Sequence, residues 1–192
     1  MILDALTPAD VEAVRTWRNR DDCRMGLRTS YVLTQEMQAQ WYRDVICHRA
    51  SAQRYFAVRE DAQAPIVAQV GLTNIAWENG TAEISLIVAP AEQQRGIGRA
   101  AVRLALREGF ERSRLQRISG EVYHCNPEAL AFWLERMEEY TAWRRGHPPS
   151  WGDLVTVLPD RKWWRGRYWH ATWFVFTADT WKPNDAGGGG GE

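Results

Sequence analysis

The stretch VAPAEQQRGIGRAAVRLAL, residues 88–106, runs from an apolar segment through a proline and two glycines into a helical pattern. A turn needs at most one glycine, and helix interiors disfavour glycine. At a helix N-terminus, however, the first backbone N–H groups have no intrahelical partner, and the helix dipole is positive there. Gly96 and Gly98 let an anion approach those N–H groups, and Arg95 and Arg99 add charge-assisted hydrogen bonds. This stretch is therefore interpreted as a phosphate-binding loop.

Two common nucleotide-binding motifs do not fit the loop. A Walker A loop requires Gly-Lys-Ser/Thr, which is missing here. The dinucleotide-binding fingerprint requires a third glycine where this chain has Ala101. From the short motif alone, a glycine-rich connector ahead of a surface helix stays open as the alternative.

Apolar periodicities on both sides of the loop predict the order helix, helix, strand meander, helix, strand, helix and hairpin. Thr7 and Thr34 are the predicted caps of the first two helices, which place Val11, Val14 and Trp17, and then Met37, Trp41 and Val45, on apolar faces. Strands are predicted at 54–60, 65–77, 81–90 and 117–125, helices at 98–112 and 126–137, and a final hairpin that turns at Arg165-Gly166. The sequence ENG at 78–80 predicts a hairpin turn.

A meander followed by a strand-helix-strand crossover predicts an α/β (α+β) fold. Its sheet is mixed, mostly antiparallel and twisted, with helices on both faces and a C-terminal β-hairpin. The chain has 192 residues, which suits one domain with one core. We expect that domain to span residues 1–181 and the glycine-rich segment 182–192 to be a flexible tail.

Composition narrows the function classes. The formal net charge is zero, so the protein has no general attraction to nucleic acid or to acidic membranes. No apolar run reaches the roughly 18 residues of a membrane span, and the N-terminus lacks a signal pattern. The three cysteines, Cys23, Cys47 and Cys125, are odd in number and are not spaced as metal ligands. These features predict a cytoplasmic protein with reduced thiols and no metal.

The loop and its surroundings resemble the GNAT N-acetyltransferases. The acyl-CoA motif of that family reads Gln/Arg-x-x-Gly-x-Gly/Ala, and Gln93-Gln94-Arg95-Gly96-Ile97-Gly98 matches it in full. The resemblance covers nearly the whole chain, because VRTWRNRDDCR, QAQWYRDV, RYFAV, VGLTNI and WWRGRYWHATWFVF follow the order of one branch. That branch contains ribosomal-protein acetyltransferases and nucleotide-linked amino-sugar acetyltransferases.

The resemblance implies acetyl-CoA as the acyl donor and assigns its binding residues. The strand in ISLIVAP would diverge from its neighbour, so that the backbone of Ile87 and Val88 pairs with the pantetheine arm. The backbone N–H groups from Arg95 to Arg99 would hold the pyrophosphate, and the Asn126 side chain would face the CoA arm. In full, the residues that the resemblance implies for CoA binding are Ile87, Val88, Gln93, Gln94, Arg95, Gly96, Ile97, Gly98, Arg99, Asn126 and Trp133.

Acetyl transfer to an amine also requires a base and an acid. Glu83 and Glu121 are the candidate bases, because a carboxylate can accept the amine proton directly or through water. Many family members carry a tyrosine where this chain has Trp133, and an indole N–H cannot act as an acid near neutral pH. Water, Tyr123 or Tyr140 would then protonate the departing thiolate. His124 is a further candidate base, although a structural role is the commoner one for such a histidine.

The acceptor is predicted to lie near Trp17, Arg18 and Asn19, because the first two helices often border the acceptor site in this fold. Arginines there suggest an anionic acceptor. Two acceptor classes are open: a small-molecule amine, such as a nucleotide-linked amino sugar, and a protein N-terminus.

Two rival functions are also open. One is a non-catalytic CoA-binding module, with Trp133 marking the loss of the acid. The other is modification of an amine on nucleic acid, because RKWWRGRYWH alternates basic and aromatic residues that can stack on bases. The zero net charge disfavours nucleic acid as a partner. Exposed aromatic residues in the hairpin would equally serve a homodimer contact.

Overall fold

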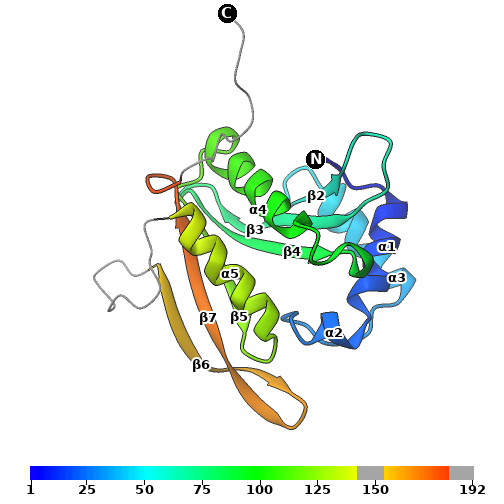
Figure 1. Cartoon of the computed structure of the whole chain (residues 1–192). Coiled ribbons are helices and arrows are strands. Elements are labelled where there is room, and N and C mark those ends of the chain that lie inside the picture. Colours follow the sequence, from blue (N-terminus) through cyan, green and yellow to red (C-terminus); the bar gives the residue numbers. More distant parts are fainter. Residues whose placement is uncertain (142–153, 182–192) are drawn as a thin grey trace, which may run out of the picture.

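The computed structural model describes residues 1–141 and 154–181 (Figure 1). The predicted tail at 182–192 lies outside the described residues. The boundaries expected for the single domain therefore stay a prediction.

Seven strands form one sheet in the order β1-β2-β3-β4-β5-β7-β6. Every neighbouring pair is antiparallel except β4 and β5, which are parallel. The mixed, mostly antiparallel sheet with its closing hairpin confirms the predicted fold class. The strands are β1 (Ile2–Ala5), β2 (Arg54–Arg59), β3 (Ala68–Ala76), β4 (Thr81–Val88), β5 (Arg117–Tyr123), β6 (Val155–Trp164) and β7 (Arg167–Thr177).

Helices cover both faces of the sheet (Figure 1). Helices α4 (Ile97–Arg107) and α5 (Pro127–Tyr140) pack on one face over the larger core. Helices α1 (Pro8–Arg18) and α3 (Gln35–Trp41) pack on the other face around a smaller cluster, and the short α2 (Asp21–Arg24) follows α1. Short turns complete the described elements: two π-helical turns at Tyr42–Ile46 and Glu108–Arg112, and a 3-10 turn at Pro90–Glu92.

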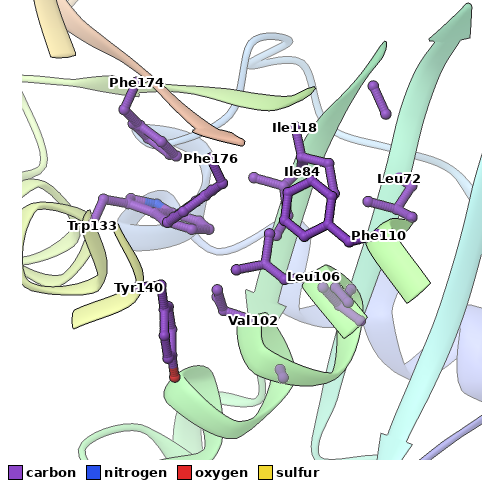
Figure 2. Close-up of a cluster of buried hydrophobic side chains, with 14 of the residues drawn as sticks. Leu72, Ile84, Val102, Leu106, Phe110, Ile118, Trp133, Tyr140, Phe174 and Phe176 are labelled. Carbon is purple, nitrogen blue, oxygen red and sulfur yellow. The ribbon is translucent and has the colours of Figure 1, made fainter. Parts of the chain in front are cut away.

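The larger core depends on the regular spacing of apolar residues in α4. Its buried residues recur every three or four positions, which gives one continuous apolar stripe facing the sheet: Ile97, Ala101, Val102, Ala105 and Leu106. Figure 2 shows this cluster, in which Trp133 of α5 stacks on Phe174 of β7 with ring centroids 4.8 Å apart. The helix that carries the glycine loop is thereby fixed to the sheet along its whole length.

The structure differs from the sequence-based expectation at four places. Strand β1 was not predicted, because four residues give too short a pattern, and it forms by pairing with β2. Helix α2 lies between the two predicted N-terminal helices, where the sequence predicts no helix. Met37, which was predicted to lie on the apolar face of its helix, is exposed, whereas Gln38 is buried. Strand β6 begins at Val155, ahead of the predicted start of the hairpin, because residues 155–158 pair with β7.

Helix α1 is attached to the sheet through a buried ion pair. Thr7 and Asp10 form a capping box at its N-terminus. The same Asp10 carboxylate accepts a 2.6 Å hydrogen bond from Arg59 Nη2 of β2, and the two side chains are only 7% and 10% exposed. Arg59 also pairs with Asp4 of β1 through Nε at 3.1 Å. This contact fixes the N-terminal end of α1 against the sheet.

The closing hairpin is tied to the segment that follows α2. Arg165 and Gly166 both have positive φ, 49° and 83°, as a two-residue hairpin turn requires. Behind the turn, the buried Lys162 donates hydrogen bonds from Nζ to Leu27 O and to Ser30 Oγ. Burial lowers the pKa of Lys162. The C-terminal hairpin therefore holds the loop at 25–30 from across the molecule.

Replacing Asp10 with Asn should destabilise the protein by about 3–5 kcal/mol, because it leaves the buried Arg59 guanidinium without its main counter-charge. Urea unfolding followed by circular dichroism measures the change. Glu108→Gln is the matched control, since it removes an exposed pair with Arg112 and should cost at most about 1 kcal/mol. Equal losses of stability in the two variants would contradict the anchoring role.

Lys162→Met should loosen the loop at 25–30 while keeping the apolar stem of the side chain. The Leu27 carbonyl and the Ser30 hydroxyl then lose their donor, so the local opening free energy falls. Hydrogen exchange should show the amides of Gly26 and Leu27 exchanging at least tenfold faster. Arg165→Gln changes an exposed cation in the same hairpin and should leave these rates unaltered. Unchanged exchange in Lys162→Met would show that the loop is held by other contacts.

Candidate functional site

The central feature of the site is the divergence of β4 from β5. The two strands pair only from Thr81 with Arg117 to Glu83 with Ser119. Beyond that point β4 continues to Val88, paired with β3 on one edge only. The backbone groups of Ile84–Val88 on the other edge therefore have no strand partner. Unpaired backbone groups inside a protein need a partner from elsewhere, and an extended ligand can supply it.

A cavity of about 990 Å³ occupies this divergence. Residues from β4, β5, the glycine loop, α5, the end of α1 and the segment after α2 line it. One end is formed by Gln93, Gln94, Gly96, Gly98 and Arg99, and another part by Glu83, Glu121 and Tyr123. A volume of this size suits an extended small molecule rather than a single ion.

The glycine loop has the geometry that an anion requires. Gly96 is the N-cap of α4 with φ 78°, a left-handed conformation that favours glycine, and Gln94 also has positive φ. A Cβ at Gly96 would meet nothing within 4 Å, so the space beside this backbone is open. The first intrahelical bond runs from Ala100 N to Gly96 O. The N–H groups ahead of Ala100 are thus free for a ligand.

Gly98 serves the packing of two helices. A Cβ there would lie 3.2 Å from the Phe132 ring of α5 and 3.6 Å from Val88. Arg99 lines the cavity and pairs with Glu139 of α5, with its Nε 2.7 Å from Oε1. Helices α4 and α5 therefore meet closely at the mouth of the cavity.

Asn126 and Trp133 lie on the α5 side of the cavity. The Asn126 side chain caps α5 by accepting a hydrogen bond from Ala129 N at 3.0 Å, which leaves its Nδ2 for other partners. Trp133 is 9% exposed and is held between Phe132 and Phe174. It lines the cavity as part of an aromatic wall.

The two candidate bases share one arginine. Arg28, in the loop after α2, pairs with Glu83 and lies 3.5 Å from Glu121. Glu83 also accepts a 2.8 Å hydrogen bond from Asn74 Nδ2, and Arg161 Nε lies 3.1 Å from Glu121. Both carboxylates line the cavity, with Glu121 on the divergent part of β5. Sequence reasoning missed Arg28 because nothing local distinguishes it from its neighbouring arginines.

Tyr123 is the candidate acid that the structure places in the cavity. Burial and the nearby Glu121 charge raise the pKa of its phenol, and Arg28 partly opposes that rise. The phenol is therefore protonated at neutral pH and has a proton to donate. Tyr140, the other candidate, is buried in the core beneath α5 and does not line the cavity.

At the acceptor end, the structure brings Trp17 and Arg18 to the cavity but not Asn19. The Asn19 side chain bonds both backbone groups of Leu33, donating to O at 2.9 Å and accepting from N at 2.8 Å. It thus joins the end of α1 to the start of α3, and the prediction that it contacts substrate is not supported. Tyr55 of β2, which sequence reasoning missed, also lines this part.

Two residues predicted to bind CoA at the glycine loop have side chains that do not line the cavity. Ile97 is 2% exposed and belongs to the core, so only its backbone can reach a ligand. Arg95 is exposed and pairs with Glu92. The other predicted donor-side residues line the cavity: Ile87, Val88, Gln93, Gln94, Gly96, Gly98, Arg99, Asn126 and Trp133.

His124 and Cys125 lie outside the cavity lining. His124 Nε2 is 2.9 Å from Thr172 Oγ1, and burial together with the nearby His170 lowers its pKa. Cys125 Sγ contacts Met25 O at 3.3 Å, and burial raises the pKa of its thiol. A raised thiol pKa opposes nucleophilic chemistry. Both side chains therefore have structural contacts at the end of β5.

In the hairpin, Trp163 and Tyr168 form an exposed cross-strand pair with centroids 5.0 Å apart. The neighbouring cations already have partners: Arg161 at Glu121, and Arg167 over the Trp169 ring at 3.5 Å. This arrangement stabilises the hairpin and the cavity wall.

Within the described residues, no group of three or more His, Cys, Asp or Glu side chains is arranged to hold a metal ion. Nor does any helix in that part of the chain have the length and apolar character needed to cross a bilayer.

Comparisons with known proteins agree with this geometry. A spermidine N(1)-acetyltransferase of Vibrio cholerae is 34% identical over 85 residues, which are 44% of this chain and 49% of that enzyme, so the match spans about half its length. The acetyltransferase PseH of Campylobacter jejuni is 23% identical over 130 residues, 68% of this chain and 77% of that protein.

Among solved structures, the spermidine N-acetyltransferase from Vibrio cholerae in complex with CoA and spermine has the same fold. Its TM-score is 0.74 at 23% identity, covering 93% of this chain and 96% of that one. Residues 1–136 match the family described as the Acetyltransferase (GNAT) domain. The chain therefore belongs to the GNAT family of N-acetyltransferases.

Proposed function

We propose that this protein is an acetyl-CoA-dependent N-acetyltransferase that transfers the acetyl group directly to the primary amine of a small molecule. One observation carries the proposal: the free edge of β4 at Ile84–Val88 leads directly into a left-handed glycine at the N-terminus of α4. An extended polar arm that ends in a pyrophosphate matches both features at once.

The residues present fit this donor. The backbone of Ile87 and Val88 supports pairing with the amide groups of the pantetheine arm, as a β-strand partner would. The open N–H groups after Gly96 support pyrophosphate binding, and Gln93, Gln94 and Arg99 surround them. Asn126 Nδ2 and the Trp133 wall face the same space. The bound thioester supplies the activated acetyl group.

In this proposal Glu121 is the general base. It lies on the part of β5 that has left β4, within the cavity, and its carboxylate can accept the proton of the attacking amine directly or through water. Glu83 is the second candidate, at the point where the two strands part. Because Glu83 pairs with Arg28 and accepts a hydrogen bond from Asn74, it also fits a role in holding the loop at 25–30 in place.

Tyr123 is the proposed acid. As the C–N bond forms and the C–S bond breaks, the phenol donates its proton to the departing sulfur. A backbone N–H on the free edge of β4 is suited to stabilise the developing negative charge on the carbonyl oxygen. Trp133 contributes only packing, because its indole cannot exchange a proton near neutral pH.

The acceptor class is tested by a panel. Free-thiol release is measured with amino sugars, polyamines, a peptide with a free N-terminus and nucleic acid. The names of two relatives indicate spermidine as their acceptor, and protein N-termini are used in the branch that the sequence resembles. Turnover confined to peptide or nucleic acid would overturn the small-molecule assignment. A lack of turnover across the panel, despite CoA binding, would favour a binding module.

Gly96→Ala should weaken CoA binding by at least tenfold, because a methyl group enters the open space beside the helix N-terminus. Thermal shift and calorimetric titration with CoA measure the effect. Gly166→Ala is the matched control: its φ is 83°, its Cβ space is equally open, and it lies outside the cavity. If wild-type protein gains no thermal stability from millimolar CoA, the donor assignment is wrong.

Glu121→Gln should reduce kcat by about 10²–10⁴-fold, the usual range for loss of a general base, with CoA affinity kept within twofold. Glu83→Gln should raise the acceptor KM more than it lowers kcat, because it releases Arg28. Steady-state kinetics with acetyl-CoA and the best panel amine separate the two. Wild-type kcat in both variants would remove the base assignment.

Tyr123→Phe should lower kcat at every pH between about 6 and 9. Because the pKa of Tyr123 is raised above its ordinary value near 10, the wild-type phenol stays protonated across this range. Wild-type kcat should therefore show no alkaline decline caused by Tyr123 below about pH 10. If Tyr123→Phe keeps full activity, water rather than Tyr123 donates the proton to the departing sulfur.

A further inference from the structure

The charged side chains that line the cavity are almost all paired. Asp22 pairs with Arg20, Arg28 with Glu83, and Glu121 with Arg161. At the donor end, Arg99 and Arg136 share Glu139. Two lining charges have no ion-pair partner among the described residues, Arg18 and Glu128. Glu128 is exposed in the first turn of α5, where water and the helix dipole solvate it.

Arg18 is different because its guanidinium is partly removed from water. Its Nε is buried and has no hydrogen-bond acceptor among the described residues. A buried donor without an acceptor is destabilising, by about 1–3 kcal/mol and more for a charged group. Its position in the last turn of α1 places a cation favourably at the negative end of the helix dipole, but that does not satisfy the buried Nε.

Tyr55 lines the same cavity as Arg18, and the Arg18 charge acts on its phenol. Its ring is packed edge-on against Trp41 and fills the space above Gly71, where a Cβ would come within 2.4 Å of the ring. Burial raises the pKa of the Tyr55 phenol, Arg18 and Arg28 oppose the rise, and Glu83 adds to it. These three charged groups therefore all act on the phenol. The hydroxyl makes no hydrogen bond to any residue in the described part of the chain, and Tyr55 lines the cavity.

We propose that Arg18 and Tyr55 form an oxyanion subsite within the acceptor end of the cavity, and that the acceptor amine carries a phosphate or carboxylate group that binds there. This inference rests on the proposed function and deepens it by assigning the substrate class. The unmet requirement is that of the buried Arg18 Nε, and the Tyr55 hydroxyl is a second hydrogen-bond donor in the same cavity; an acceptor with negative charge can satisfy both.

The charge balance around Glu83 and Glu121 disfavours the opposite class. A polyamine needs free carboxylates along its length, whereas Glu83 and Glu121 already face Arg28 and Arg161. A second ammonium group near Arg18 would meet an uncompensated cation of like charge. An anionic group satisfies Arg18, and the neutral amine of the same molecule can still reach Glu121.

The test uses the full chain and a matched set of amines: glucosamine, glucosamine 6-phosphate, glucosamine 1-phosphate and glucosaminic acid, with spermidine as the cationic member. At least one anionic member should exceed glucosamine in kcat/KM by tenfold or more, and spermidine should rank last. The phosphate and carboxylate arms distinguish which oxyanion the subsite takes.

Arg18→Gln should reduce the anionic-to-neutral ratio of kcat/KM to near one, mainly by raising the acceptor KM. Arg18→Lys keeps the charge without the planar fork and should retain part of the ratio. Arg43→Gln, an exposed arginine of the turn after α3, should leave the ratio unchanged. If Arg18→Gln instead raises the KM for acetyl-CoA, the arginine serves the donor and the subsite is overturned. Equal kcat/KM for charged and neutral amines, or a preference for spermidine, also overturns it.

Binding distinguishes failure of this inference from failure of the proposed function. Calorimetry with the same amines and CoA-loaded protein should show the anionic preference in the wild type and its loss in Arg18→Gln. If no amine is acetylated but this preference is present, the subsite stands and the proposed function fails. If turnover occurs without any anionic preference in binding, the proposed function stands and the subsite fails.

Discussion

The structure depends on the parting of two parallel strands. A parallel ladder normally continues for as long as both strands do, because every backbone N–H and C=O inside a sheet needs a partner. Here the ladder stops at Glu83 and Ser119, and both strands run on. The fold tolerates this because each strand has a complete partner on its other edge: β3 for β4 and β7 for β5. The divergence is therefore a rigid, built feature rather than a frayed end.

The glycine loop follows from the same constraint. Once β4 reaches Val88 with a free edge, the chain must reverse into α4 without filling the space that the strand has opened. A left-handed Gly96 makes that turn without a side chain, and the apolar stripe of α4 fixes the helix to the sheet. The part of the cavity proposed to bind the donor is thus formed by consecutive elements whose positions are set by backbone geometry and core packing.

Whether a feature could be predicted from sequence depends on whether it is set by neighbouring residues or by distant ones. The strand order around the loop, the caps at Thr7, Thr34 and Asn126, and the turn at Arg165-Gly166 all have local signals, and the structure contains them. The contacts of Arg28, Tyr55 and Lys162 have none, because each depends on residues of other elements that lie far from it in the sequence. The contact of Asn19 has no local signal either, because its partner is the Leu33 backbone, which the sequence does not place near it.

Lys162 gives this arrangement a further consequence. The part of the cavity proposed to bind the donor is built from one continuous segment between β4 and α5. The part proposed to bind the acceptor combines the end of α1 and β2 with a loop that the C-terminal hairpin holds. The hairpin lies beyond the 136 residues that match the family, and yet it holds the loop carrying Arg28. If the proposed function holds, substrate choice in this scaffold can diverge through changes in the last strands, while the segment proposed to bind the acyl donor stays unchanged.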